Sequence, residues 1–269
     1  MKRSVFVIAA VLFSFLSQAQ TRLKEVMTLK MPRTREDSMP GTRGASVVWH
    51  PIQKKYYAAF AGNWGYPLAI FDVKGTRLSG DDLNTNEDLR GLWYNPDAKE
   101  IQGNTYSDYG WFIYNLGTDG SILGSRTLFS GMNQPDKQSV GTYNYKDRKV
   151  LFVHSGSLYS YDIADSSIIS STEINWGKRK SSSGDLAEYE SSENYNRTAL
   201  IYTGIAGSEI GFLNVEKKQI ELYDYTSCHL SKVLPLPEDA PAERSFNFAY
   251  ANGIYWLFDM DGRTWHGYK

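Results

Sequence analysis

A repeating pattern of four short apolar runs constrains the fold more than any other feature of this sequence. The clearest copy extends from Arg43 to Ser79. Turn residues separate its four runs, which cover residues 45–49, 55–61, 68–73 and 76–79. Short runs rich in β-branched and aromatic residues, bounded by Gly, Pro and Asn, predict β-strands. This copy therefore predicts one four-stranded sheet within about forty residues.

The pattern returns in weaker form along the rest of the chain. The innermost strands of the copies are anchored near Arg43, Arg90, Gln138, Leu186 and Arg244. The first three intervals are nearly equal and the fourth is longer. A sheet-forming repeat of nearly constant length predicts the blades of a β-propeller rather than a β-sandwich of many short strands. We therefore predict an all-β, five-bladed propeller of four-stranded blades.

The fifth copy reaches Lys269 after only three strands, so one strand is missing from it. The unassigned strand-like segment is Arg22 to Met31, near the opposite end of the chain. We expect this segment to be the outer strand of the last blade, so that the N-terminal strand closes the ring against the C-terminal blade. Ring closure of this kind leaves no exposed edge between the first and last blades.

The fourth copy is the least regular. We assign its four strands to residues 186–196, 197–204, 209–215 and 219–226, and treat residues 227–237 as an extra loop. The alternative is a six-bladed ring, in which residues 227–237 begin a further partial blade.

The first nineteen residues have the pattern of a signal peptide. Lys2 and Arg3 precede an apolar run, and small residues follow at Ser17 and Ala19. The run is shorter than the roughly 20 residues of a membrane-spanning helix. We expect residues 1–19 to be removed, residues 20–269 to form a single propeller domain, and the protein to be exported to the periplasm or beyond the cell.

The charge balance bears on the kinds of partner, and the cysteine count bears on disulfide bonds. The chain has 29 basic and 30 acidic residues, so no excess of charge attracts nucleic acid or an anionic membrane. We therefore expect no nucleic-acid partner and no membrane span. Cys228 is the only cysteine, which excludes an internal disulfide.

Four copies share an apolar run, then Asp or Asn, then a turn. These segments read AIFDVKG, FIYNLGTDG, LYSYDIADS and GFLNVEKK. On this pattern the chain resembles secreted bacterial β-propellers of the TolB-like and NHL-like kind, over Arg22 to Lys269. The resemblance implies binding and scaffolding roles more often than catalysis, and the site itself must decide between them.

Candidate binding residues lie in loops that should share one face of the ring. Arg43, Arg90 and Arg244 each precede an innermost strand, where they could surround the channel mouth and bind a carboxylate, phosphate or acidic sugar. The alternative is that each arginine pairs with a nearby acid, such as Asp88 or Glu243.

A second group combines amides with aromatic rings. Asn63 and Trp64 follow one Gly, and Asn104 and Tyr106 follow another. Aromatic area and a directional amide suit a sugar ring or a peptide. The alternative is that Gly-Asn pairs only provide the backbone conformations that turns need.

A third group is acidic. Asp88, Asp259 and Asp261 could hold a hard cation such as calcium, or act as a general acid and base, if they meet at the channel. The alternative is solvated loop acids. His154 is the histidine we place on the same face. No cofactor motif occurs, and G-x-S-x-G, H-E-x-x-H and phosphate-binding glycine loops are missing from the sequence.

These observations favour an exported, non-catalytic binding module for a protein, peptide or glycan ligand, held on the loop-rich face. The alternative function is a secreted carbohydrate- or lactone-active hydrolase or lyase with carboxylates at the central channel. The two hypotheses differ in one requirement, because the enzyme needs a pair of acids, or an acid and His154, facing each other across the channel.

Overall fold

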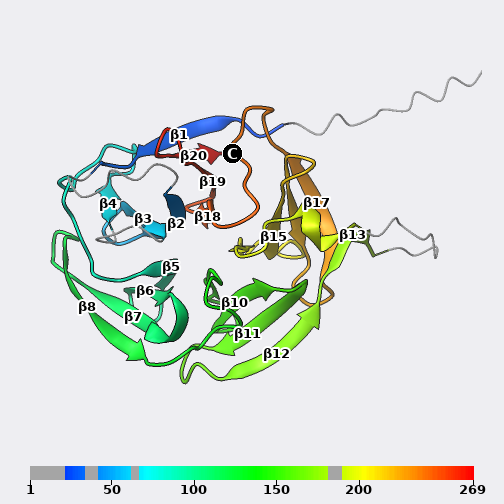
Figure 1. Ribbon diagram of the computed structural model, residues 1–269, viewed down its shortest axis with the longest axis horizontal. Helices are drawn as coiled ribbons and strands as arrows, with labels where there is room; N and C mark the ends of the chain where they lie inside the picture. Colours follow the sequence, from blue (N-terminus) through cyan, green and yellow to red (C-terminus); the bar gives the residue numbers. More distant parts are fainter. Residues whose placement is uncertain (1–21, 34–41, 62–66, 181–189) are drawn as a thin grey trace, which may run out of the picture.

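Five sheets surround one axis and form a five-bladed β-propeller, which confirms the predicted fold (Figure 1). The computed structural model describes residues 22–33, 42–61, 67–180 and 190–269. Apart from two single-turn 3₁₀ helices, η1 (Ser107–Tyr109) and η2 (Ser192–Asn194), every regular element of these residues is a strand. None of the described helices is long and apolar enough to cross a membrane.

The first three blades follow the sequence in order, from the innermost strand outward. Blade 1 contains β2 (Arg43–His50), β3 (Lys55–Ala61) and β4 (Leu68–Phe71). Blade 2 contains β5 (Leu89–Asn95), β6 (Glu100–Thr105), β7 (Trp111–Leu116) and β8 (Ile122–Phe129). Blade 3 contains β9 (Thr142–Asn144), β10 (Lys149–His154), β11 (Ser157–Asp162) and β12 (Ile168–Glu173).

The last two blades each include an outer strand that comes before their innermost strand in the sequence. Blade 4 contains β14 (Ile201–Tyr202), β15 (Ile210–Asn214), β16 (Gln219–Tyr223), β17 (His229–Pro235) and, outside it, β13 (Asn175–Arg179). Blade 5 contains β18 (Phe248–Ala251), β19 (Ile254–Asp259), β20 (Thr264–Tyr268) and β1 (Glu25–Lys30). Strand β13 pairs with β17 in parallel, whereas the other strand pairs are antiparallel.

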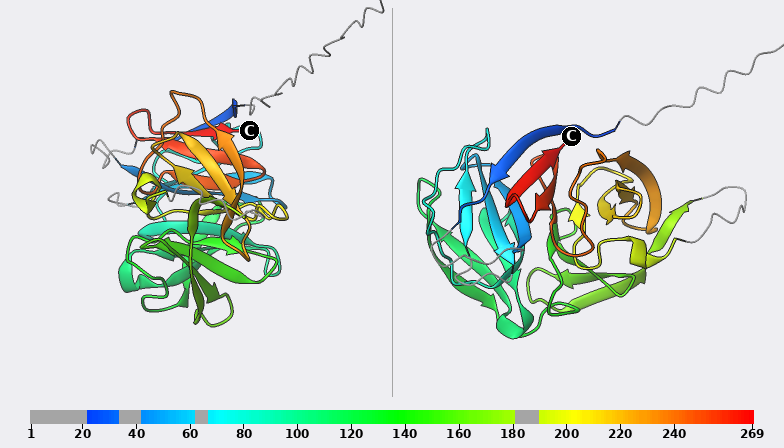
Figure 2. Two further views of the ribbon diagram at one scale, coloured as in Figure 1. Left: turned by 90° about the vertical axis from the view of Figure 1, so that its right-hand side faces the viewer. Right: turned by 45° about the horizontal axis from the view of Figure 1, so that its top comes forward.

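The ring closes as predicted, through the N-terminal strand. Strand β1 pairs with β20, with Glu25 opposite Tyr268 and Lys30 opposite Thr264. Figure 2 shows β1, in blue, lying along the red C-terminal strand. Next to this ladder, the backbone N–H of Lys24 donates to Lys269 and that of Lys269 donates to Lys24, at 3.0 and 2.9 Å. Closure therefore depends on main-chain hydrogen bonds between the two ends of the described chain.

Blade 4 corrects two sequence predictions. The segment 186–196 is not its innermost strand: Tyr195 makes only an isolated bridge to Asn214, and residues 186–189 lie outside the described residues. Each later strand moves one place inward, so residues 227–237, predicted as a loop or as the start of a sixth blade, contain the outer strand β17. The reason is polarity, because the axial position is buried and Ile201 fills it at 1% exposure, whereas 186–196 is mostly polar.

The outer strand predicted at residues 76–79 of blade 1 is also incomplete. Arg77 forms only an isolated bridge with Phe71, and the Leu78 N–H donates to the Ile70 carbonyl at 2.7 Å. Blade 1 is therefore a three-stranded sheet with a short irregular edge.

The arrangement of the innermost strands defines two channel mouths. Neighbouring innermost strands contact one another in a closed circle, β2 to β5, β9, β14, β18 and back to β2. From each of them the chain passes outward through antiparallel neighbours, and all five run in the same direction along the axis. Their N-terminal ends meet on the face that carries the inter-blade connections and the loops between second and third strands, which we call the loop face. Their C-terminal ends meet on the opposite side, the turn face.

Candidate functional site

Two of the three predicted arginines converge on the loop-face mouth. The Arg43 and Arg90 guanidinium carbons lie 6.0 and 5.6 Å from the centre of the Phe246 ring. Arg90 is 4% exposed, and its guanidinium carbon also lies 4.7 Å from the centre of the Tyr106 ring. Cation–π contacts of this kind hold a guanidinium in place and leave part of its edge for hydrogen bonds.

Arg90 uses its hydrogen bonds within the protein. It donates to Asp88 Oδ1 at 2.6 Å, to Gln138 Oε1 at 2.9 Å and to the Leu89 carbonyl at 2.8 Å. This is the local pairing with Asp88 that the sequence left open as an alternative. Arg90 therefore acts in this structure as a brace between blades 2 and 3.

Arg244 does not join the other two arginines. Its guanidinium donates to Glu216 Oε2 at 3.1 Å and to the Glu193 carbonyl, and its side chain is 48% exposed. The partner is thus Glu216, rather than the sequence neighbour Glu243. Arg43, in contrast, donates to the Ser245 hydroxyl next to Phe246.

The amide and aromatic group is split by the fold. Asn104 is completely buried, where its Nδ2 donates to the Ser139 carbonyl at 2.8 Å and its Oδ1 accepts from the Gly141 N–H at 2.9 Å. It therefore joins blade 2 to the entrance of blade 3. Tyr106 lies against Arg90, as described above. Asn63 and Trp64 lie outside the described residues.

The predicted acids do not meet across the channel. Asp88 pairs with Arg90 in blade 2. Asp259, in blade 5, caps its own turn, because its carboxylate accepts from the N–H groups of Asp261 and Gly262 at 3.0 and 2.9 Å. Among the described residues, no group of three or more His, Cys, Asp or Glu side chains could hold a metal ion.

A pocket of about 420 Å³ opens on the loop face between blades 3 and 4. His154, at the end of β10, lines it as the sequence placed it. Gln138, which accepts from Arg90, lines its side toward the channel. We call it the loop-face pocket; its lining also includes Asp136, Trp176, Glu193 and Arg197. Its volume lies in the range of small-ligand sites.

A tight turn explains why the pocket lies at this position. Strands β10 and β11 are joined by only Ser155 and Gly156, both with positive φ, 48° and 79°. Positive φ at both central residues is the type I′ hairpin geometry, which needs no further loop residues. The corresponding loop of blade 2, Tyr106 to Gly110, is longer and contains η1. The short turn therefore leaves room for a pocket between blades 3 and 4.

Trp176 forms the floor of the loop-face pocket. It is 2% exposed, and its ring lies 4.3 Å from that of Tyr195 and 5.0 Å from that of Phe212. Polar side chains surround this apolar floor: Asp136 and Glu193 supply carboxylates, Arg197 supplies a guanidinium group and His154 supplies an imidazole. The pocket can therefore bind a ligand that carries donors, acceptors and both signs of charge.

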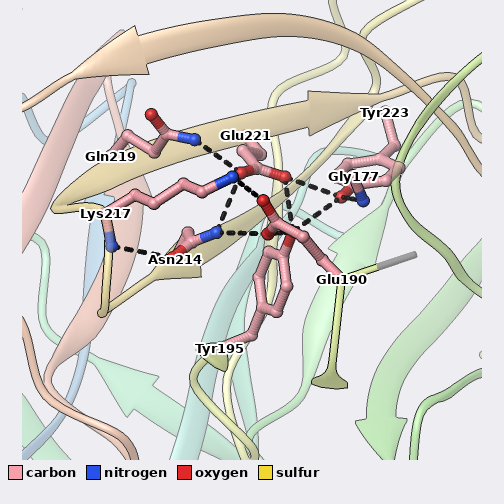
Figure 3. A network of polar contacts seen from close by, with 8 residues as sticks. All are labelled: Gly177, Glu190, Tyr195, Asn214, Lys217, Gln219, Glu221 and Tyr223. Atoms are coloured by element: carbon pink, nitrogen blue, oxygen red, sulfur yellow. Dashed lines mark hydrogen bonds and ion pairs between the residues drawn. The ribbon is translucent and has the colours of Figure 1, made fainter. Parts of the chain in front are cut away.

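A buried polar network lies behind this floor (Figure 3). The Tyr195 hydroxyl lies 2.6 Å from Glu190 Oε2 and 2.8 Å from Glu221 Oε2, so its single proton can serve only one carboxylate at a time. The Tyr223 hydroxyl also donates to Glu221 Oε2, at 2.8 Å. Asn214 Nδ2 donates to both carboxylates, and Lys217 forms an ion pair with Glu190.

The network keeps its tyrosines neutral. Burial, and then the neighbouring Tyr223 and Glu221, raises the pKa of Tyr195 above its ordinary range. Burial and Glu221 also raise the pKa of Tyr223. Both hydroxyls therefore remain hydrogen-bond donors at neutral pH. They fix the Tyr195 ring, which in turn supports Trp176.

Glu221→Gln is expected to lower the free energy of unfolding by about 3 kcal/mol, because hydrogen-bond donors converge on a carboxylate that is only 1% exposed. In the variant, the amide NH₂ group would replace one of the two carboxylate oxygens. The donors that now bond to that oxygen would then face another donor. Thermal unfolding followed by circular dichroism should show a melting temperature lower by roughly 6–12 °C. Glu216→Gln, at a surface ion pair, is the matched control and should cost under about 1 kcal/mol. Equal melting temperatures for the two variants would contradict this account.

Several residues of the pocket were not foreseen from the sequence. Trp176 was placed at the start of an inter-blade segment, and Arg197 at the start of the predicted second strand of the fourth copy, both without a role. Glu190 and Glu221 come from segments about thirty residues apart, so only the fold brings them together. A signal was present in the unusually short His-Ser-Gly-Ser turn, which predicts an uncovered site between longer loops.

Comparisons with known proteins extend only to the fold. No protein-family model matches the chain, and no curated protein matches its sequence. Among solved structures, the chain is similar to a glutaminyl cyclase from Myxococcus xanthus, with a TM-score of 0.58 and 10% sequence identity. The match covers 92% of this chain and 95% of that one. At this identity, the likeness supports the propeller architecture alone.

Proposed function

We propose that this protein is a binding module that holds a peptide in the loop-face pocket. The observation that carries the proposal is the mixture of charges around the aromatic floor formed by Trp176: Asp136 and Glu193 are acidic, Arg197 is basic, and His154 adds an imidazole. A peptide presents donors and acceptors along its backbone and both signs of charge at its termini. Of the three ligand classes that the sequence suggested, it matches this lining best.

The neighbouring arginine cluster supports the same proposal. Arg90 holds Gln138 at the rim of the pocket, and Arg90 is itself fixed by Asp88 and by two aromatic rings. A rim side chain that is fixed before binding loses little conformational entropy when a ligand arrives. We also propose that the protein is exported, because residues 1–19 have the pattern of a signal peptide. The proposal further includes that the propeller is of the TolB-like or NHL-like type.

The test is a thermal-shift screen of the chain from Gln20 with tri- to hexapeptides that have free termini. A peptide at about one hundred times its dissociation constant should stabilise the fold by about 2.7 kcal/mol. For a chain of this size, that corresponds to roughly 5–10 °C in melting temperature. Arg197→Ala and His154→Ala should each reduce the shift.

Arg126→Ala is the matched control, because Arg126 is an exposed arginine on β8 that pairs with Glu100, outside the loop-face pocket. It should leave the peptide shift unchanged. Binding that Arg197→Ala does not weaken, or no shift with any peptide, would count against the pocket. Oligosaccharides in the same screen separate a glycan ligand from a peptide.

Catalysis is the second candidate function. One solved structure with a similar fold is described as a glutaminyl cyclase, and blade 4 contains a close pair of carboxylates, Glu190 and Glu221. However, Glu221 is 1% exposed and its oxygens already accept from neighbouring donors, so the pair favours a structural role. Mass spectrometry of peptides recovered after incubation separates the two functions: unchanged masses support binding, and a cleaved or cyclised product supports catalysis.

A further inference from the structure

A second pocket, of about 330 Å³, lies at the opposite mouth of the channel. It is lined by residues at and just beyond the C-terminal ends of the innermost strands, of which β2, β5 and β18 are labelled near the axis in Figure 1. Every blade contributes an aromatic side chain there: Trp49, Tyr94, Tyr145, Tyr202 and Tyr250. We call this the turn-face pocket. The sequence predicted only tight turns on this face and gave no indication of a site there.

The aromatic side chains of the turn-face pocket are held by further rings. Trp49 packs against Tyr56 with ring centres 4.6 Å apart, and Tyr250 packs against Tyr255 at 5.0 Å. Tyr202 meets Tyr145 edge-to-face at 5.4 Å. Tyr145 itself is 48% exposed. The pocket thus offers apolar ring surface whose orientation is set before any ligand binds.

The chemistry of the lining disfavours an anionic ligand. None of the sixteen described residues that line the pocket is acidic, basic or histidine. A carboxylate or phosphate group entering it would lose water without gaining a counter-charge. Burial also raises the pKa of Tyr202 and of Tyr250, so these hydroxyls are neutral at neutral pH.

Polar groups in the turn-face pocket are few and uncharged. Asn252 lines it, and its Nδ2 donates to the Tyr56 hydroxyl at 2.8 Å, which orients the amide. Thr142 and the tyrosine hydroxyls add further hydrogen-bonding groups. Aromatic faces combined with neutral donors and acceptors fit a ligand with apolar faces and hydroxyl-bearing edges.

We propose that the turn-face pocket binds a neutral saccharide. Its sugar ring would stack on the aromatic side chains, and its hydroxyl groups would bond to Asn252 and to the tyrosine hydroxyls. The loop-face pocket, with its charged lining, lies on the other side of the ring. The saccharide site is therefore independent of the peptide site, and each can be tested while the other is intact.

Isothermal titration calorimetry with cellobiose and maltose tests this proposal on the chain from Gln20. At least one of these neutral sugars should bind at concentrations up to about 10 mM, whereas glucuronate should not. Tyr145→Ala should weaken binding about tenfold, as the loss of one stacking ring implies. Tyr145→Phe keeps the ring and should retain most of the affinity.

Tyr109→Ala is the matched control, because Tyr109 is 72% exposed and belongs to η1 on the loop face. It should leave sugar binding unchanged, and Tyr145→Ala should leave the peptide shift of the loop-face pocket unchanged. The proposal is overturned if neither sugar binds, if Tyr109→Ala and Tyr145→Ala weaken binding equally, or if glucuronate binds as well as cellobiose. Binding of hexaproline without either sugar would also overturn it, in favour of a proline-rich peptide.

Discussion

Gly91→Ala is expected to prevent blades 2 and 3 from docking and to yield little soluble, folded protein. A Cβ atom at Gly91 would lie 2.5 Å from the Gly141 carbonyl oxygen and 2.6 Å from the Gly141 nitrogen. It would also lie 2.5 Å from Asn104 Oδ1, the atom that accepts from the Gly141 N–H. Two backbones meet here without space for a methyl group, and main chain in adjoining blades cannot rotate away as a side chain could.

The expected loss is more than about 4 kcal/mol, a large part of the 5–15 kcal/mol by which domains are usually stable. Soluble yield and thermal unfolding measure it. Gly80→Ala is the control, since a Cβ at Gly80 meets nothing within 4 Å. Gly80→Ala should leave the free energy of unfolding unchanged or raise it slightly, because alanine allows the unfolded chain fewer conformations than glycine does. A Gly91→Ala protein that melts within a few degrees of the parent would show that the two blades can separate at low cost.

Removal of residues 1–31 is the second change with a large expected effect. It deletes β1 and leaves the hydrogen-bonding edge of β20 unpaired. It also removes Leu29 and Met31, which are 0% and 2% exposed in a cluster with Phe258 and Trp265. Losing two buried side chains of this size costs roughly 4–10 kcal/mol, before the lost strand hydrogen bonds are counted.

We therefore expect the truncated chain to be insoluble or to associate through its open blade, as measured by size-exclusion chromatography. The matched control removes only residues 1–21 and should remain monodisperse. A synthetic peptide of residues 22–33 added to the truncated chain should raise its melting temperature by restoring the ladder with β20. A truncated chain as stable as the control would mean that β1 contributes nothing to closure.

Much of the fold could be predicted because it depends on a local, repeated pattern. Each copy of the apolar repeat needed only strand and turn propensities to be recognised, and the missing strand of the fifth blade pointed to residues 22–31. Blade 4 could not be assigned correctly, because its innermost strand is only Ile201–Tyr202. So short a strand carries almost no periodic signal, and its burial is decided by neighbouring blades.

The candidate sites were harder to predict, since each is assembled from distant segments. The sequence placed His154 on the loop face, and it left open the pairing that Arg90 makes with Asp88. It gave no means of seeing that Trp176 lies beneath the Ser155-Gly156 turn, because that depends on how blades 3 and 4 pack. The aromatic side chains of the turn-face pocket could have been noticed in the sequence. Trp49, Tyr94 and Tyr250 occupy similar places near the C-terminal ends of their innermost strands.

Because β1 pairs with β20, the ring can close only after both strands have been synthesised. Glu25 pairs with Tyr268, so roughly 240 residues separate the partners, and at about 5–20 residues per second the first leaves the ribosome roughly 10–50 s before the second. Blades 1 to 4 can form during that interval, but β1 must wait without its partner. The nascent chain therefore carries an unpaired strand until β20 has emerged, and during this period β1 is open to mispairing and to binding by chaperones.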